Sequence, residues 1–125
     1  MTAFTGDIQI LLYTEEMDFS ACRDFYQTLL GQEPYYSWNE GTQDRGAKFR
    51  AGRGTISVLC QAHDRKTGPV ILNLETGDVD QTYQALAATD GIRIVSKPVT
   101  QSYGTRYFAV EDPCGNRINL YHSNH

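Results

Sequence analysis

Apolar residues along the 125-residue chain fall into short segments, each closed by a turn or capping residue. The run 7–13, DIQILLY, has one polar interruption among aliphatic side chains and predicts a strand. Asp18 then offers a helix N-cap and Gly31 a helix stop. Between them, apolar residues recur at helical spacing at Cys22, Phe25, Tyr26 and Leu29. The chain therefore begins with a strand and an amphipathic helix.

Three further strands follow this helix. Pro34 breaks the helical pattern, and the aromatic segment 35–38 predicts a short strand. Residues 39–46 are polar and predict a loop. The segments 47–50 and 55–60 flank the turn sequence Ala-Gly-Arg-Gly and predict a β-hairpin.

The same order of elements starts again after the polar segment 61–68, which we interpret as a linker. Residues 69–74 predict a strand, Asp78 caps a second helix, and Gly91 is expected to stop it. The apolar face of this helix consists of Val79, Tyr83, Leu86 and Ala87. The second half of the chain thus repeats the strand and helix of the first.

The repeat continues to the C-terminus. Residues 92–95 predict a strand, 97–102 a loop, and 103–121 a closing hairpin that matches the first hairpin in order and length. The chain is therefore predicted to contain two βαβββ modules, 1–62 and 68–125.

The turn of the closing hairpin has a specific chemistry. Pro113 fixes its own φ angle, Gly115 can adopt a positive φ, and the side chains of Asp112 and Asn116 can bond backbone amides. An aromatic-rich strand precedes the turn, and alternating apolar residues follow it. In this pattern the segment resembles the closing hairpin of the vicinal oxygen chelate superfamily, which includes glyoxalases, extradiol dioxygenases and the bleomycin- and fosfomycin-resistance proteins.

The resemblance covers the whole chain and implies its architecture. It implies an α+β fold in which two βαβββ modules form a curved, open, barrel-like mixed sheet with a concave cleft. Residues 1–125 would form one glyoxalase/bleomycin-resistance-like domain. The resemblance also implies a homodimer in which each cleft is completed across the interface.

The metal position of the superfamily is altered in this sequence. In metal-dependent members a Glu three residues after the turn Asn ligates a divalent metal, and this chain has Asn119 there. The other ligand positions implied by the resemblance are Gln9, Ile71 or its neighbour, and Val58 or its neighbour. Amide and aliphatic side chains are poor ligands for divalent metals, so we expect no metal and no other cofactor. Gln9 and Asn119 have the alternative role of satisfying backbone groups near strand edges.

Strand alternation, combined with the resemblance, places aromatic, aliphatic and amide side chains in the cleft. The candidate ligand-binding residues are Gln9, Leu11, Tyr13, Trp38, Ile71, Asn73, Tyr103, Tyr107, Asn119 and Tyr121. No catalytic residue is assigned among them. Trp38 has the alternative of packing, with Tyr35 and Tyr36, against the first helix.

Composition restricts the partners of the protein. The net charge of −4 argues against a nucleic-acid or anionic-membrane surface, either of which favours a basic stripe, and leaves a small molecule as the expected ligand. No apolar run is long enough to span a bilayer, and the N-terminus lacks signal-peptide features, so a cytoplasmic location is expected. The three cysteines lack a CxxC spacing and are interpreted as reduced thiols.

Three functions are compatible with these observations. The favoured one is a metal-free binding protein of the bleomycin-resistance type, which sequesters a planar or aromatic compound such as an antibiotic or toxin. The alternative is an enzyme, either a metal-dependent lyase resembling lactoylglutathione lyase, an isomerase or dioxygenase, or a metal-free catalyst that uses Tyr103 or Tyr107 as an acid. Catalysis is disfavoured because the resemblance implies enzymes that rely on the metal to stabilise an enolate or oxyanion, and without a metal a tyrosine hydroxyl is a weak acid at neutral pH. The third is a structural or regulatory module with a filled cleft.

Overall fold

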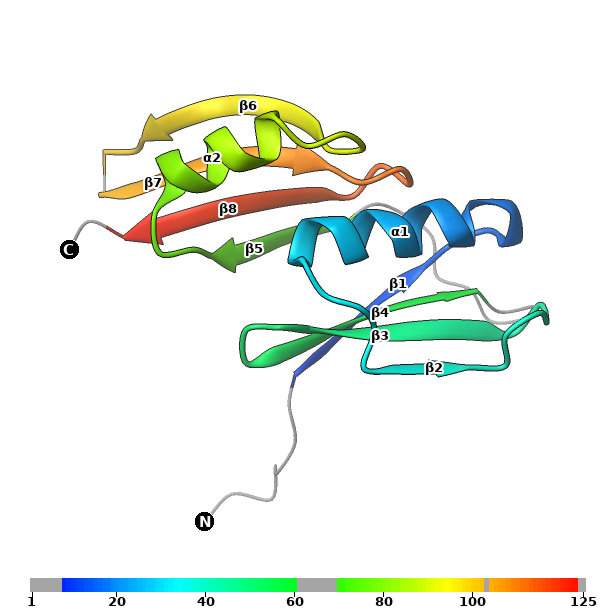
Figure 1. Ribbon diagram of the computed structural model, residues 1–125. Coiled ribbons are helices and arrows are strands. Elements are labelled where there is room, and N and C mark those ends of the chain that lie inside the picture. The colour runs from blue at the N-terminus through cyan, green and yellow to red at the C-terminus, as the bar shows by residue number, and fades with distance from the viewer. Residues whose placement is uncertain (1–7, 61–69, 103, 124–125) are drawn as a thin grey trace, which may run out of the picture.

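The computed structural model describes residues 8–60, 70–102 and 104–123, and the chain forms two βαβββ modules (Figure 1). Module 1 contains β1 (Gln9–Tyr13), η1 (Glu16–Asp18), α1 (Phe19–Leu30), β2 (Tyr36–Trp38), β3 (Arg45–Ala51) and β4 (Gly54–Cys60). Module 2 contains β5 (Ile71–Glu75), α2 (Val79–Ala87), β6 (Arg93–Thr100), β7 (Thr105–Glu111) and β8 (Arg117–Ser123). The predicted α+β fold is confirmed. The predicted linker 61–68 and Tyr103 lie outside the described residues.

The two modules have the same strand order. Sheet 1 runs β1-β4-β3-β2 and sheet 2 runs β5-β8-β7-β6. In each sheet the first and last strands of the module pair in parallel, and the remaining neighbours are antiparallel. Both sheets remain open. This order places the first strand of each module directly beside its last strand.

Each helix covers one face of its own sheet, and α1 lies between the two sheets in Figure 1. Alternate residues of the strands form the core under the helices, and Phe49, Val58, Phe108 and Ile118 are fully buried there. The ring of Tyr83 on α2 packs edge-on against Phe108, with 5.3 Å between ring centroids. The buried residues of both modules form one cluster. A typical buried aliphatic side chain stabilises the folded state by about 1.5–3 kcal/mol, so this cluster holds the modules together.

The helix ends agree only in part with the sequence prediction. Gly31 ends α1 with a φ of 67°, as expected, and the carboxylate of Asp78 accepts a hydrogen bond from the Gln81 amide at 3.1 Å. Asp18 occupies the N-cap position of α1, but its side chain makes no capping bond because the chain enters the helix through η1. Gly91 was expected to stop α2, which instead ends at Ala87. Thr89 provides the local reason, since its hydroxyl donates to the Ala85 carbonyl at 2.7 Å.

The predicted loop 97–102 is wrong for most of its length, because β6 extends to Thr100. This extension includes Pro98, although proline lacks a backbone N–H and is disfavoured in the interior of a sheet. β6 is an edge strand of sheet 2, where proline is tolerated, and its pairing with β7 shifts register between Ile94 and Ser96 and again between Ser96 and Val99.

A buried carboxylate joins the modules. Asp112, in the turn between β7 and β8, is 3% exposed and accepts a hydrogen bond from the Tyr26 hydroxyl of α1 at 2.7 Å. The Cys22 thiol, also on α1, lies 3.9 Å from the same oxygen. Within the turn, Asp112 accepts from the backbone amides of Cys114 at 2.9 Å and Asn116 at 2.8 Å, and from the Asn116 side chain at 2.7 Å. We call these five residues the Asp112 cluster.

The donors from α1 remain protonated. Burial first, and then the charge of Asp112, raise the pKa of both the Cys22 thiol and the Tyr26 hydroxyl above their ordinary values. Both groups therefore act as hydrogen-bond donors to the carboxylate at neutral pH. The three cysteines are free thiols, as predicted. None of the helices in the described ranges is long and apolar enough to cross a membrane.

Candidate functional site

Each sheet has a face turned away from its helix, which we call its open face. On sheet 2, alternate residues of β5, β7 and β8 carry side chains to this face. Cross-strand pairing aligns Asn73 with Asn119 and Tyr107 with Tyr121. The residues that the helix covers, including Phe108 and Leu120, alternate with these positions. Two amides and two phenol rings therefore meet on one surface.

A pocket of about 360 Å³ lies on this open face, and we call it the module 2 pocket. It is lined by Asn73, Gln101, Thr105, Tyr107, Arg117, Asn119 and Tyr121. This volume falls near the lower end of the range for small-molecule sites. All seven side chains carry a hydrogen-bond donor, and none is a carboxylate.

A chain of hydrogen bonds forms one wall of the module 2 pocket. The Arg117 Nε donates to Asn119 Oδ1 at 3.1 Å, and Asn119 Nδ2 donates to Asn73 Oδ1 at 2.9 Å. A guanidinium can only donate, so it fixes Asn119 with its oxygen towards Arg117 and its nitrogen towards Asn73. Asn73 then accepts through its oxygen and keeps its own NH₂ group for another partner. Arg117 therefore sets the donor and acceptor roles in both hydrogen bonds.

The structure brings together four of the residues proposed from the sequence: Asn73, Tyr107, Asn119 and Tyr121 line the module 2 pocket. Ile71 does not. It pairs with Arg117 on the edge strand β5 and is 68% exposed. The resemblance implied Ile71, or its neighbour, as the ligand position of this strand, whereas Asn73 is the residue opposite Asn119. Ile71 and Asn73 are two residues apart, so both lie on the same face of the strand.

The other predicted residues belong to sheet 1. Gln9, Leu11 and Tyr13 lie on alternate positions of β1, and the Ser57 hydroxyl donates to Gln9 Oε1 at 3.3 Å. Ser57, rather than the adjacent Val58, therefore lies on the same face of sheet 1 as Gln9. These residues line no part of the module 2 pocket. Within one chain, the predicted set is divided between two open faces.

Trp38 lies on the open face of sheet 1. Its ring stacks on Tyr36 with centroids 6.1 Å apart and an interplanar angle of 21°. It also covers Gly46 so closely that a β-carbon at Gly46 would collide with the ring. Lys48 Nζ lies 6.0 Å from the Tyr36 ring centroid. The aromatic residues of β2 are thus arranged as a small stack with a cation beside it.

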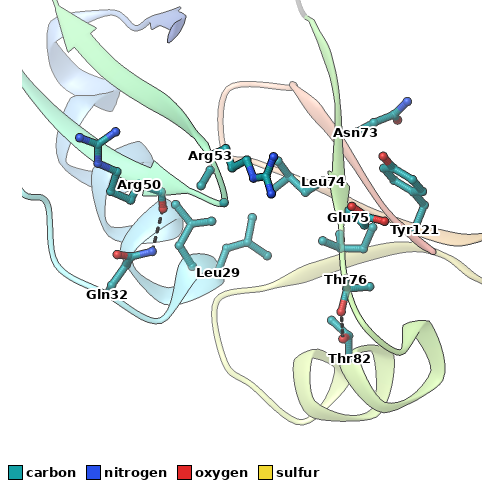
Figure 2. Close-up of a pocket in the computed structure, with 14 residues that line it drawn as sticks. Leu29, Gln32, Arg50, Arg53, Asn73, Leu74, Glu75, Thr76, Thr82 and Tyr121 are labelled. Atoms are coloured by element: carbon teal, nitrogen blue, oxygen red, sulfur yellow. Dashed lines mark hydrogen bonds between the residues drawn. The ribbon is translucent and has the colours of Figure 1, made fainter. Parts of the chain in front are cut away.

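A larger pocket of about 870 Å³ lies between the modules, and we call it the inter-module pocket (Figure 2). Leu29 and Arg53 of module 1 and Leu74 of module 2 form parts of its wall. Asn73 and Tyr121 line both this pocket and the module 2 pocket. Figure 2 shows these two side chains on one side of β5 and Leu74 on the other.

Residues 9–120 match the family model of the glyoxalase/bleomycin resistance protein/dioxygenase superfamily. The chain belongs to this superfamily. No curated protein sequence matches the chain. Solved structures of the superfamily resemble it closely in fold over nearly its full length.

Three of these structures illustrate the likeness. A member of the superfamily from Sphaerobacter thermophilus DSM 20745 is 21% identical, covers 96% of this chain and 98% of its own, and has a TM-score of 0.71. A lactoylglutathione lyase from Agrobacterium tumefaciens is 17% identical, covers 94% of this chain and 92% of its own, and has a TM-score of 0.71. TioX from Micromonospora sp. ML1 is 17% identical, with coverage of 95% and 99% and a TM-score of 0.75.

The side chains at the metal position of this superfamily member do not fit a divalent cation. Asn119 offers a neutral amide whose oxygen already accepts from Arg117, and the guanidinium places a positive charge beside it. That charge repels a second cation, and the opposing Asn73 contributes no negative charge. Across residues 8–60, 70–102 and 104–123, no three His, Cys, Asp or Glu side chains are grouped so that they could hold a metal ion.

The ligand-binding residues predicted from the sequence did not include three residues of the module 2 pocket, Gln101, Thr105 and Arg117. Arg117 lies two positions before Asn119, so alternation along β8 was a sufficient signal for it. Gln101 follows β6, in a segment predicted as a loop, and gave no such signal.

Proposed function

We propose that this superfamily member is a small-molecule binding protein that holds a planar or aromatic compound in the module 2 pocket without a metal. The observation that carries the proposal is the pairing of Tyr107 with Tyr121 across β7 and β8, next to the amides of Asn73 and Asn119. An aromatic ligand ring that packs against one of these tyrosines gains about 0.5–1.5 kcal/mol per pair of rings beyond burial. The amides then orient the polar groups of the ligand.

The biological role that fits such a site is sequestration of an antibiotic or toxin in the cytoplasm. A binding protein of this kind acts by lowering the free concentration of the compound and needs no catalytic group. Neutral amides and tyrosines are suited to binding, since they form hydrogen bonds without changing protonation state.

The functional unit in this proposal is a homodimer. The open faces carry exposed apolar side chains, with Leu11 48%, Tyr36 55% and Ile71 68% exposed. A second copy of the chain would bury these residues and add the open face of its sheet 1 to the module 2 pocket. Light scattering on the purified protein is expected to give twice the 14.1 kDa mass of one chain. A monomer at micromolar concentration would contradict the dimer.

The ligand proposal is tested by thermal shift and isothermal titration with a panel of planar aromatic compounds, alongside elemental analysis of protein purified without chelator. At least one compound is expected to raise the melting temperature. Tyr107→Ala should abolish the shift, because it removes one ring of the pocket. Tyr107→Phe keeps the ring and should retain binding, which makes it the matched control.

Two results would overturn the proposal. Stoichiometric metal, or a rise in melting temperature that requires a divalent metal, would favour a lyase, isomerase or dioxygenase activity instead. Binding that is equally strong in wild type and Tyr107→Ala would place the ligand outside the module 2 pocket.

A further inference from the structure

Charge distinguishes the module 2 pocket from an ordinary aromatic cleft. Arg117 is the only formally charged side chain among its seven lining residues. Its Nε is bonded to Asn119, while the terminal nitrogens of the guanidinium have no partner among the described residues. The guanidinium is therefore held in place through one nitrogen and offers the other two to a ligand.

Among the described residues, no carboxylate forms an ion pair with Arg117. Glu111 lies directly opposite Arg117 on β7, but its carboxylate is paired with Arg93 Nη1 at 2.9 Å. A second acidic residue, Glu75, lies on the open face at the end of β5, but it lines the inter-module pocket and not the module 2 pocket. The positive charge of Arg117 is thus left to be matched by a bound molecule.

The amides beside Arg117 favour the same kind of ligand. Because Arg117 orients Asn119, and Asn119 orients Asn73, the bonded chain ends in the NH₂ group of Asn73. Free donors consequently remain at both ends of this series of hydrogen bonds, on the Arg117 guanidinium and on the Asn73 amide. The Tyr107 and Tyr121 hydroxyls add further groups that can donate. An acceptor with several lone pairs fits this arrangement.

We infer that the module 2 pocket selects an aromatic carboxylate, with Arg117 as the residue that binds the carboxylate group and Tyr107 and Tyr121 as the walls for the ring. The planar guanidinium fork matches the two oxygens of a carboxylate. This inference rests on the proposed function and adds the charge and class of its ligand. Arg117 would then anchor the ligand beside Asn119 and Asn73, whose amides do not fit a metal.

The test is isothermal titration of the full-length protein with 2-naphthoate and its neutral analogue 2-naphthamide. A charge-assisted hydrogen bond contributes about 1.5–3 kcal/mol, so wild-type protein is expected to bind naphthoate about ten- to a hundredfold more tightly. Arg117→Gln should remove this preference, so that naphthoate binds no more tightly than naphthamide. Arg117→Lys keeps the charge but loses the fork, and should retain part of the preference.

Arg53→Gln is the matched control, since it removes the same charge from the inter-module pocket but not from the module 2 pocket. Loss of the preference in this control would assign the anion to the inter-module pocket and overturn the inference. Equal binding of both compounds by wild type, unchanged by Arg117→Gln, would also overturn it and leave the proposed function standing. Binding of neither compound would count against both.

Discussion

Replacing Asp112 with alanine is expected to lower the free energy of unfolding by about 3–5 kcal/mol, because it leaves several buried donors without an acceptor. The Tyr26 hydroxyl and the amides of Cys114 and Asn116 all point at this carboxylate. Such a loss is a large part of the 5–15 kcal/mol that stabilises a typical domain. Urea denaturation followed by circular dichroism measures it.

Two comparison variants make the Asp112→Ala experiment specific. Tyr26→Phe removes a single hydrogen bond to the carboxylate and should cost about 1.5–3 kcal/mol. Asp24→Ala removes a 66% exposed carboxylate that pairs with the adjacent Arg23, and should change stability by less than about 1 kcal/mol. If Asp112→Ala costs no more than Asp24→Ala, the Asp112 cluster does not join the modules as described.

Phe108→Ala is expected to destabilise the protein by about 3–5 kcal/mol, because it empties a fully buried site in the core. Tyr83 on α2 would lose its edge-on ring partner at the same time. The m-value of urea denaturation should stay unchanged while the midpoint falls. A loss below about 1 kcal/mol would mean that the core under α2 rearranges to fill the space.

The adjacent residue on the same strand gives the contrasting result. Tyr107 lies on the open face, so Tyr107→Ala should leave stability within about 1 kcal/mol of wild type. It should instead remove binding of the aromatic ligand. Neighbouring positions on β7 therefore separate a folding defect from a binding defect, and equal loss of stability in both variants would contradict the assignment of the two faces.

Local chemistry allowed much of this fold to be predicted from the sequence. The expected bonds of Asp112 and Asn116 to backbone amides are present, and Asn116 Oδ1 also accepts from the Val70 amide at 2.9 Å. Alternation along β7 and β8 correctly grouped Tyr107, Asn119 and Tyr121. These features depend on residues close together in sequence, whose geometry is set by the turn and by the period of a strand.

Features that depend on distant pairing could not be predicted. The alignment of Asn73 with Asn119 depends on the register of two strands 46 residues apart in the chain, and the resemblance pointed instead to Ile71 or its neighbour. The extension of β6 through Pro98 required knowing that β6 is an edge strand. The bond from Tyr26 to Asp112 joins residues from different modules, so neither local sequence contains it.

The irregular course of β6 has a consequence for solubility. An edge strand exposes backbone donors and acceptors, to which a strand of another chain can attach and start aggregation. Pro98 withdraws one donor from β6, and its two register shifts interrupt the regular spacing of the rest. The exposed Lys97 beside Pro98 adds a charge that disfavours burial under a second sheet. The β6 edge of sheet 2 is thereby protected against uncontrolled strand addition, although the open face of the sheet carries apolar side chains.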